Sequence, residues 1–472
     1  MLLTRQLLVT LSACMVSTTF ALAAPPSASV ADYGAVGDGV TNDTTAFNQC
    51  LSGNTICWVN PAKIYAVKDV VINNSNRLIG LANIEYGTST AATASARPVL
   101  IGFAGATNVL NVSAVSKGAA IDGIFIDCKS NSVNGISGGS FQLIVNDATI
   151  VGCANGIGGS AYTGGIHIMN TTFGGNTTGL ANIVDSFVMN ADFANNASNG
   201  IYLGAGSNAN TIVNCRFEWN QGFGILSYGG TEANSISNSL FDRNYSAGLG
   251  LIGVTGMTVS NSVFFRNGRN NVAPDQNTQI YVSGSKNISI SGGLSKVGQD
   301  DGGTGTYTPA YVFSYDPGSP SSNITISGFA TSGLFNATTN PTGSYTTAPV
   351  EGTEPAAGYS VLGVNDIATT LPAIAGITAF ASGGQTNATQ LSASVNTVST
   401  ASAANASVKL TPCIAGRQQT VANLGANSIQ VFGSSPNTIN SIATGTGVAQ
   451  AAGKIATYVC TGSGNWTRLL SN

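Results

Sequence analysis

Two carboxylates stand at the same point of a repeated pattern, and their spacing suggests acid–base chemistry. Glu218 and Asp242 are 24 residues apart, and each directly follows a phenylalanine. If the repeats stack as parallel strands, the two residues lie roughly 4.8 Å from each other. Two carboxyl groups about 5 Å apart are typical of retaining glycosidases, in which one is the acid and the other the nucleophile. Their repulsion would keep one of them protonated, as the acid must be.

Three arginines accompany these acids in the sequence and allow two further interpretations. Arg243 and Arg266 follow the carboxylate column, and Arg216 lies two residues before Glu218. In a uronate lyase, carboxylates hold Ca²⁺ against the substrate, and an arginine removes a proton or neutralises the uronate. Strict alternation would turn Arg243 and Arg266 inward, so this chemistry requires a corner in the chain there. Alternatively, the acids and arginines form a surface ion network without a catalytic role.

Aromatic residues and a pair of aspartates are the candidates for substrate binding. Tyr228 and Tyr245 fall on the same repeats as the carboxylates, where outward tyrosines would stack on sugar rings. Trp219 lies two residues beyond a phenylalanine of the apolar column, so alternation predicts that it is part of the core. Asp300 and Asp301 stand among glycines, as expected for the wall of a substrate site or for an ordinary turn.

A repeat of 20 to 24 residues must position these side chains. Its apolar column is formed by Phe173, Phe193, Phe217, Phe241 and Phe264, and each is followed three residues later by Asn176, Asn196, Asn220, Asn244 and Asn267. Two further apolar runs accompany each phenylalanine, separated by Gly, Asn and Ser. Three short apolar runs per repeat indicate a three-sided parallel β-helix. The inward asparagines are expected to form a structural ladder of hydrogen bonds.

Composition supports an ordered β-rich chain and argues against a nucleic-acid partner. Of the 472 residues, 43% are hydrophobic and only 8% are charged. A solenoid needs few charges, because most of its residues face a stacked interior or uncharged turns. The formal net charge is −3 and no cluster of lysines and arginines occurs, so nucleic acid is not an expected partner.

The N-terminal residues have the features of a secretory leader. Arg5 precedes an apolar stretch at 7–20, and Ala21-Leu22-Ala23 fits a cleavage site. Residues 1–23 are therefore predicted to be a signal peptide, and the mature chain to be extracellular or periplasmic. A lipoprotein box at Leu11-Ser12-Ala13-Cys14 is the alternative. No later segment reaches the roughly 18 apolar residues that a membrane span needs.

The cysteines predict disulfides, which an exported chain permits. The expected pairs are Cys50–Cys57, which are close in sequence, Cys128–Cys153, which occupy equivalent positions of adjacent coils, and Cys413–Cys460 near the C-terminus. Cys215 is left over. No cysteines have C-x-x-C spacing and His167 is the only histidine, so a resident metal site is not predicted.

The chain divides into four parts by composition. After the leader, residues 24–334 are expected to form the β-helix, with a short helix at 44–51 covering its first coil. Residues 335–365 are rich in Thr, Pro, Gly and Ala, which is typical of a linker. Residues 366–472 show alternating stretches without the coil pattern and are predicted to form a small antiparallel β domain.

The segment Ala31-Asp32-Tyr33-Gly34-Ala35-Val36-Gly37-Asp38-Gly39-Val40, followed by Asn42-Asp43-Thr44, resembles the N-terminal motif of the pectate lyase-like superfamily. This superfamily of rhamnogalacturonase- and epimerase-type proteins also includes phage tailspike depolymerases. The resemblance covers roughly residues 29–330 and implies a right-handed parallel β-helix that acts on or binds polysaccharide. The Gly-His-Gly and Arg-x-Lys motifs of polygalacturonases are absent, so their mechanism is not implied. Tailspike-like members are commonly trimers, so the resemblance admits a homotrimer.

Together these observations predict a secreted enzyme that degrades polysaccharide in a β-helix groove. The favoured reaction is glycoside hydrolysis by Glu218 and Asp242. The alternatives are a Ca²⁺-dependent uronate lyase that uses Arg243 or Arg266, and a non-catalytic carbohydrate-binding or adhesive protein.

Overall fold

The computed structural model divides into two compact units, Met1–Arg216 and Phe217–Asn472. It describes residues 27–470 except 74, 81–96, 114–116, 131, 139–141, 160–162, 271–273, 301–303, 317–318, 320, 329–349, 352–358, 363–372 and 463. The expected signal peptide at 1–23, Asp301 and most of the expected linker at 335–365 therefore lie outside the described residues.

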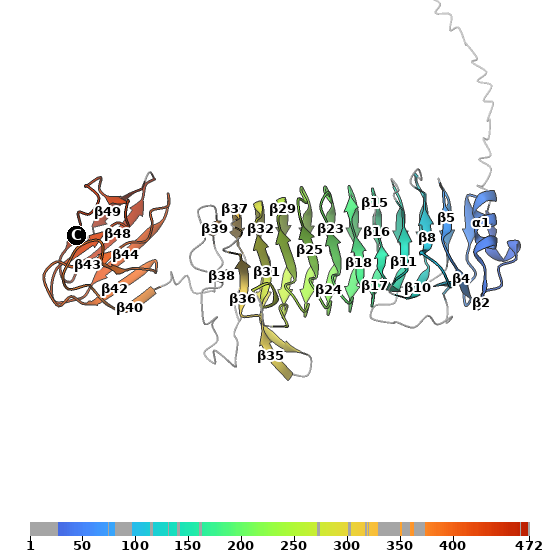
Figure 1. Cartoon of the computed structure of the whole chain (residues 1–472), viewed down its shortest axis with the longest axis horizontal. Helices are drawn as coiled ribbons and strands as arrows, with labels where there is room; N and C mark the ends of the chain where they lie inside the picture. The colour runs from blue at the N-terminus through green and yellow to red at the C-terminus, as the bar shows by residue number, and fades with distance from the viewer. Residues whose placement is uncertain are drawn as a thin grey trace, which may run out of the picture. The chain divides into compact units, whose positions relative to one another are not determined.

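Three parallel sheets build the first unit (Figure 1). The first sheet contains β1 (Ser27–Ser29), β3 (Ile56–Trp58), β6 (Arg77–Ile79), β9 (Ala120–Asp122), β12 (Ile144–Asn146), β16 (His167–Met169), β20 (Phe187–Met189) and β23 (Thr211–Val213). The second contains β2 (Asp38–Asn42), β4 (Ile64–Val67), β7 (Val99–Gly102), β10 (Phe125–Ser130), β13 (Thr149–Cys153), β17 (Thr172–Gly174) and β21 (Asp192–Ala194). The third contains β5 (Val70–Ile72), β8 (Asn108–Val112), β11 (Asn134–Ser137), β14 (Asn155–Ile157), β18 (Thr178–Ala181) and β22 (Ile201–Leu203). The chain visits the three sheets in turn, which confirms the three-sided coil.

The second unit has the same three-sheet arrangement in its β-helical part. Its first sheet contains β26 (Ser235–Ser237), β29 (Thr255–Ser260), β32 (Lys286–Ser291), β37 (Ser322–Ser327) and β39 (Tyr359–Leu362). The second contains β27 (Leu240–Asp242), β30 (Val263–Phe265) and β33 (Leu294–Lys296), and the third β25 (Ile225–Tyr228), β28 (Leu249–Ile252), β31 (Thr278–Ser283), β36 (Tyr311–Tyr315) and β38 (Val350–Glu351). β38 and β39 fall inside the segment expected to be a linker, and both pair in parallel with β-helix strands.

Short elements cover the first coil and interrupt the later ones. The helix α1 (Thr44–Gly53) contacts β3 and β5, and it begins where the sequence predicts. Asp43 stands at its N-cap position without capping it, because the Asp43 carboxylate accepts hydrogen bonds from the backbone of Val36 and Gly37 instead. Small additional elements are η1 (Val30–Tyr33), η2 (Pro274–Gln276), the pair β15 (Thr163–Gly164) with β19 (Ile183–Val184), and the hairpin β34 (Gly298–Asp300) with β35 (Thr304–Thr308).

The interior of both units contains stacked aromatic rings. Phe173 and Phe193 stack with ring centroids 4.7 Å apart in the first unit, and Phe241 and Phe264 stack at 4.5 Å in the second. All four side chains are fully buried. Because parallel strands hold equivalent residues in register, identical rings on adjacent coils can pack face to face.

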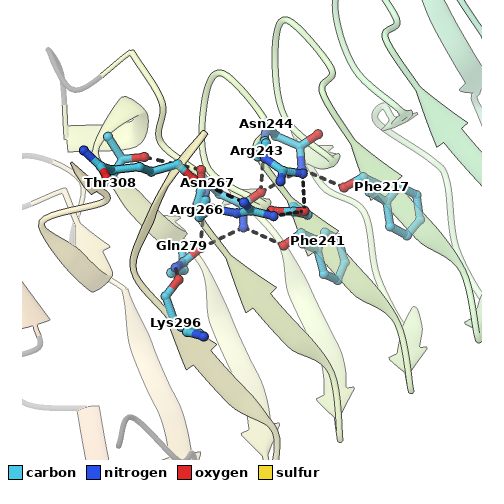
Figure 2. Close-up of polar contacts among 11 residues, drawn as sticks. Phe217, Phe241, Arg243, Asn244, Arg266, Asn267, Gln279, Lys296 and Thr308 are labelled. Atoms are coloured by element: carbon cyan, nitrogen blue, oxygen red, sulfur yellow. Dashed lines mark hydrogen bonds and ion pairs between the residues drawn. The ribbon is translucent and has the colours of Figure 1, made fainter. Parts of the chain in front are cut away.

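The asparagine column forms the expected ladder beside the rings. In the second unit the Asn220 side-chain amide donates to Oδ1 of Asn244 at 2.8 Å, and Asn244 donates to Asn267 at 2.7 Å. The Asn267 amide then donates to Oε1 of Gln279 at 2.7 Å, as Figure 2 shows. Asn176 and Asn196 make the same contact in the first unit at 3.2 Å. Each of these buried amides is therefore satisfied by the next side chain of the ladder.

Three disulfides join the expected partners. They are Cys50–Cys57, Cys128–Cys153 and Cys413–Cys460, and Cys215 is a buried free thiol. Disulfides persist in oxidising environments, so they indicate an extracellular or periplasmic protein. Among the described residues, no helix is long and apolar enough to cross a membrane.

The C-terminal residues form a small mixed β domain rather than a purely antiparallel one. One sheet contains β40 (Ala373–Thr378), β42 (Val395–Thr400), β44 (Gln418–Asn423), β48 (Ile455–Cys460), β49 (Asn465–Leu470) and β46 (Thr438–Ile439), and the other β41 (Thr389–Gln390), β43 (Ala406–Lys409), β45 (Ile429–Phe432) and β47 (Val448–Gln450). β44 pairs antiparallel with β48, as expected, but β42 and β44 are parallel. Parallel pairing arises because successive strands alternate between the two sheets. The connection between two neighbouring parallel strands of one sheet therefore contains a strand of the other sheet. Trp466 and Tyr458 are the largest side chains of this core.

Candidate functional site

The charged cluster of the second unit is built on a left-handed corner after the second-sheet strands. Trp219, Arg243 and Arg266 directly follow β24 (Arg216–Glu218), β27 and β30, and their φ angles are 58°, 55° and 59°. Left-handed backbone is costly for large side chains, at about 1–3 kcal/mol each. It interrupts the alternation of the strand and supplies the corner that the arginines require. Arg243 and Arg266 therefore lie beside Asp242 instead of entering the phenylalanine core.

Asp242 is the centre of this cluster. Its Oδ2 accepts hydrogen bonds from Nη1 of Arg243 and Nη2 of Arg266, both at 2.7 Å, and its Oδ1 accepts from Nε of Arg266 at 3.0 Å. The pairing with Arg266 is bidentate, which fixes the plane of the carboxylate. Asp242 is only 4% exposed, because the two arginines cover it. Alternation predicted that Asp242 faces outward. Arg243 of the same coil and Arg266 of the next coil cover it on that side.

The electrostatics of Asp242 reflect opposing influences. Burial raises the pKa of Asp242 above its ordinary value, and the charge of Glu218 acts in the same direction. The hydrogen bond and charge of Arg266 and the charge of Arg243 oppose this rise in pKa. Glu218 lies at the end of β24 and is partly exposed. The structure therefore brings a buried, arginine-held carboxylate and a more accessible one to the same corner.

Trp219 corrects a prediction from the sequence. It was expected in the core, but its side chain is partly exposed, and its ring lies 4.9 Å from the guanidinium carbon of Arg243 and 5.0 Å from that of Arg269. The physical reason is the left-handed corner, which turns residue 219 away from the inward direction that alternation assigns to it. The strand therefore ends its alternation at Glu218.

The structure brings only part of the remaining predicted site residues to this corner. Tyr228 is 49% exposed at the end of β25, in the third sheet, whereas the carboxylates end strands of the second. Tyr245 is partly buried, and its ring lies 5.9 Å from Arg269. Arg216 is exposed at the start of β24.

The hairpin that contains Asp300 reaches the same corner. Asp300 ends β34, and the neighbouring backbone carbonyl of Gln299 accepts a hydrogen bond of 3.1 Å from Nη1 of Arg266. Arg266 thereby links Asp242 to the hairpin. Asp301, which was predicted together with Asp300, lies outside the described residues. Figure 2 shows Arg243 and Arg266 next to the asparagine ladder.

Two observations complete the chemistry of the site. In the part of the chain that the structure describes, no group of three or more His, Cys, Asp or Glu side chains could hold a metal ion. Arg269 is a cluster member that the candidate site did not include. Its signal in the sequence is weak, since it stands two residues after the ladder residue Asn267 and repeats in no column.

Comparisons with known proteins agree with this architecture. The family model described as "Right handed beta helix region" matches residues 112–264 and 181–328. The A-module of mannuronan C-5 epimerase AlgE4 from Azotobacter vinelandii has a similar structure, with 15% identity, a TM-score of 0.51, and coverage of 71% of this chain and 96% of that one. The enzymatically active domain of tailspike protein 2 from bacteriophage CBA120 has 15% identity and a TM-score of 0.53, over 76% of this chain and 54% of that one. None of the curated proteins matches the chain in sequence. The expected right-handed parallel β-helix is confirmed.

Proposed function

We propose that this protein is an exported glycoside hydrolase that acts on polysaccharide at the corner formed by Glu218, Asp242, Arg243 and Arg266. One observation carries the proposal: a chain with only 8% charged residues gathers two carboxylates and two guanidiniums on neighbouring coils. The fold supports it as well, since β-helices of similar structure include a mannuronan epimerase and a phage tailspike protein.

The geometry suggests different roles for the two acids. A nucleophile must be ionised and oriented, and Arg243 and Arg266 favour both properties in Asp242. An acid–base residue must exchange protons with the leaving group and with water, and Glu218 is the more exposed carboxylate. Because Asp242 is 4% exposed under Arg243 and Arg266, a sugar would reach it only after these side chains move aside.

The other predicted residues would bind substrate around this pair. Arg216 and Tyr228 are exposed, and Tyr245 is partly buried near the corner. Asp300 and Asp301 would line the site from the hairpin of β34, which Arg266 contacts. A homotrimer, in which a neighbouring copy completes the site, remains part of the proposal.

A uronate lyase is the second candidate, favoured by two guanidiniums on one carboxylate, where a uronate could be neutralised. Lysis and hydrolysis differ in the mass of their products. Incubation with neutral and acidic polysaccharides, followed by mass spectrometry, should give products that carry one added water for a hydrolase. Products of eliminative cleavage are one water lighter than these and would move Arg243 and Arg266 to the centre of the mechanism.

The variants Glu218→Gln and Asp242→Asn test the residues directly. Each should lower kcat by about 10²-fold or more, because acid–base catalysis contributes about 10²–10⁴-fold. Glu232→Gln is the matched control, since Glu232 is an exposed acid outside the cluster, and it should keep full activity. Full turnover in Glu218→Gln would reject the proposed acid. Binding of polysaccharide without any cleavage by the wild type would favour the adhesive alternative.

A further inference from the structure

The three arginines at the corner differ in their partners. Arg243 and Arg266 both pair with Asp242 at 2.7 Å. Arg269 forms no ion pair with any residue that the structure describes. Asp275, the acid of η2 in the same loop, is not paired with it either. Arg269 is therefore a cation near the proposed site whose charge is not neutralised by a described carboxylate.

Two aromatic rings hold the Arg269 guanidinium in place. Its central carbon lies 5.0 Å from the Trp219 ring and 5.9 Å from the Tyr245 ring. Cation–π contacts of this kind stabilise an arginine without using its N–H groups. Its backbone is also fixed, because the Arg269 amide donates to the carbonyl of Asn244 at 3.3 Å. The side chain is thus oriented by its surroundings and does not simply extend into solvent.

The hydrogen-bonding capacity of Arg269 is largely unused. A guanidinium carries five N–H donors. The only contact of this side chain with a described acceptor is from Nη2 to Oε1 of Gln221, at a long 3.4 Å, and its buried Nε has no hydrogen-bond partner. A buried donor without a partner costs about 1–3 kcal/mol. Because Nε is buried, a ligand oxygen would reach this guanidinium through its Nη groups.

We propose that Arg269 is a specificity-determining residue that binds an anionic group of the polysaccharide, either a carboxylate or a sulfate ester. An anion with two oxygens can accept two parallel hydrogen bonds from the guanidinium, whereas a hydroxyl group of a neutral sugar cannot. The inference rests on the proposed function and gives its substrate a chemical class: a negatively charged glycan. Trp219 and Tyr245 act as positioning residues for Arg269.

The test compares binding of matched polymers by isothermal titration calorimetry. Polygalacturonate is compared with its carboxyl-reduced form, and dextran sulfate with dextran, so that the two pairs distinguish a carboxylate from a sulfate. The wild type should bind the anionic member of one pair at least 10-fold more tightly. Arg269→Gln should lose most of this preference while it still binds the neutral member. Arg269→Lys should be intermediate, because it keeps the charge without the bidentate geometry.

Arg77→Gln is the control for bulk charge, because Arg77 is an exposed arginine of β6 in the other unit. Its preference should equal that of the wild type. An unchanged preference in Arg269→Gln, or an equal loss in Arg77→Gln, would overturn the role of Arg269. A wild type that binds neutral and anionic polymers equally well would also overturn it but leave the proposed function standing. A wild type that binds none of the polymers would overturn both. If Arg269→Gln does not fold, the preference of Arg269→Lys for the anionic polymer is compared with that of the wild type, and an equal preference would overturn the role of Arg269.

Discussion

The β-helical coils of the two units have the same interior and different outer corners. Inside, each unit stacks phenylalanines at a centroid separation of 4.5–4.7 Å in the pairs described above and continues an asparagine ladder. At the corner after the second-sheet strand, the first unit has Gly175 and Asn195, with φ angles of 62° and 53°. The second unit has Trp219, Arg243 and Arg266 at the equivalent positions, also with positive φ.

This difference shows what the coil itself requires. Glycine and asparagine adopt left-handed backbone at little cost, so these two corners of the first unit form with little strain. Lys129, in the same unit, has a φ angle of 58° and pairs with the buried Asp127 at 2.8 Å. The second unit accepts strain at three successive corners, about 1–3 kcal/mol at each. Since the first unit forms these coils with Gly175 and Asn195 at the equivalent corners, the fold does not need arginine there. Its presence is therefore better explained by a ligand than by stability.

The largest expected effect concerns the shared interior. Phe173→Ala in the first unit and Phe241→Ala in the second should each lower the free energy of unfolding of the unit concerned by about 3–5 kcal/mol, because each leaves a cavity in the stacked interior. The cavity lies between Ile150 and Phe193 in the first case and between Phe217 and Phe264 in the second. Urea unfolding followed by circular dichroism measures both. Tyr228→Ala is the exposed aromatic control and should cost far less. A small effect in one unit only would disprove the view that both interiors are equivalent.

The next effect concerns the corner of the second unit alone. Asp242→Ala should cost about 3–5 kcal/mol, because it leaves the guanidiniums of Arg243 and Arg266 without their counter-ion. The triple variant Asp242→Ala/Arg243→Asn/Arg266→Asn gives this corner the residue types of the first unit and should recover most of that stability. Thermal unfolding compares the two variants. A triple variant as unstable as Asp242→Ala would mean that the cluster supports the fold.

A disulfide distinguishes the first unit from the β-helical coils of the second. Cys128 and Cys153 occupy the ladder column and are separated by 25 residues. Removing the bond in Cys128→Ala/Cys153→Ala should cost about 3.5 kcal/mol from the entropy of the unfolded chain. Denaturant unfolding with and without reducing agent measures this. The double variant should lose part of the sensitivity of this unit to reductant and keep the part that Cys50–Cys57 contributes, and an undiminished sensitivity would contradict the assignment.

The smallest effect is expected on the outer face of the first sheet. Phe187 is 45% exposed there, and the equivalent strands of the second unit carry serine and threonine, such as Ser235 and Thr258. Phe187→Ser should therefore change the free energy of unfolding by less than about 0.5 kcal/mol. A melting temperature within error of the wild type would agree with this expectation. A clear loss would show that the edge contact between the Phe187 and His167 rings, whose centroids are 5.1 Å apart, contributes to stability.

The interior of the β-helix could be predicted from the sequence because its residues repeat. The spacing of the phenylalanines and asparagines gives the three-sided coil, and the ladder column places Cys128 next to Cys153. The alternation of inward and outward residues gave a wrong prediction for Trp219, which was expected in the core, because its backbone is left-handed. The parallel strands of the C-terminal domain were missed because two sheets share the repeat, with partners 25 residues apart for Val395 and Thr420.

The candidate site was predictable only in part, for a different physical reason. Column positions place Glu218, Asp242 and the arginines on neighbouring coils. The burial of Asp242 depends on how the side chain of Arg266 reaches back from the next coil, which no spacing encodes. Arg269 was missed because it reaches Trp219 from a loop outside the repeat.

The asparagine ladder has a direction and an end. The side-chain amides of Asn220 and Asn244 each donate to the side-chain oxygen of the asparagine on the following coil. The next coil has Gly298 at the ladder position, and Gln279 fills the place from the third sheet and donates to the carbonyl of Lys296. A coil duplicated inside the ladder would find a donor on one side and an acceptor on the other. The strands β32, β33, β36 and β37 nevertheless continue the three sheets after Gln279, so coils can stack beyond the ladder, but without its buried amide hydrogen bonds.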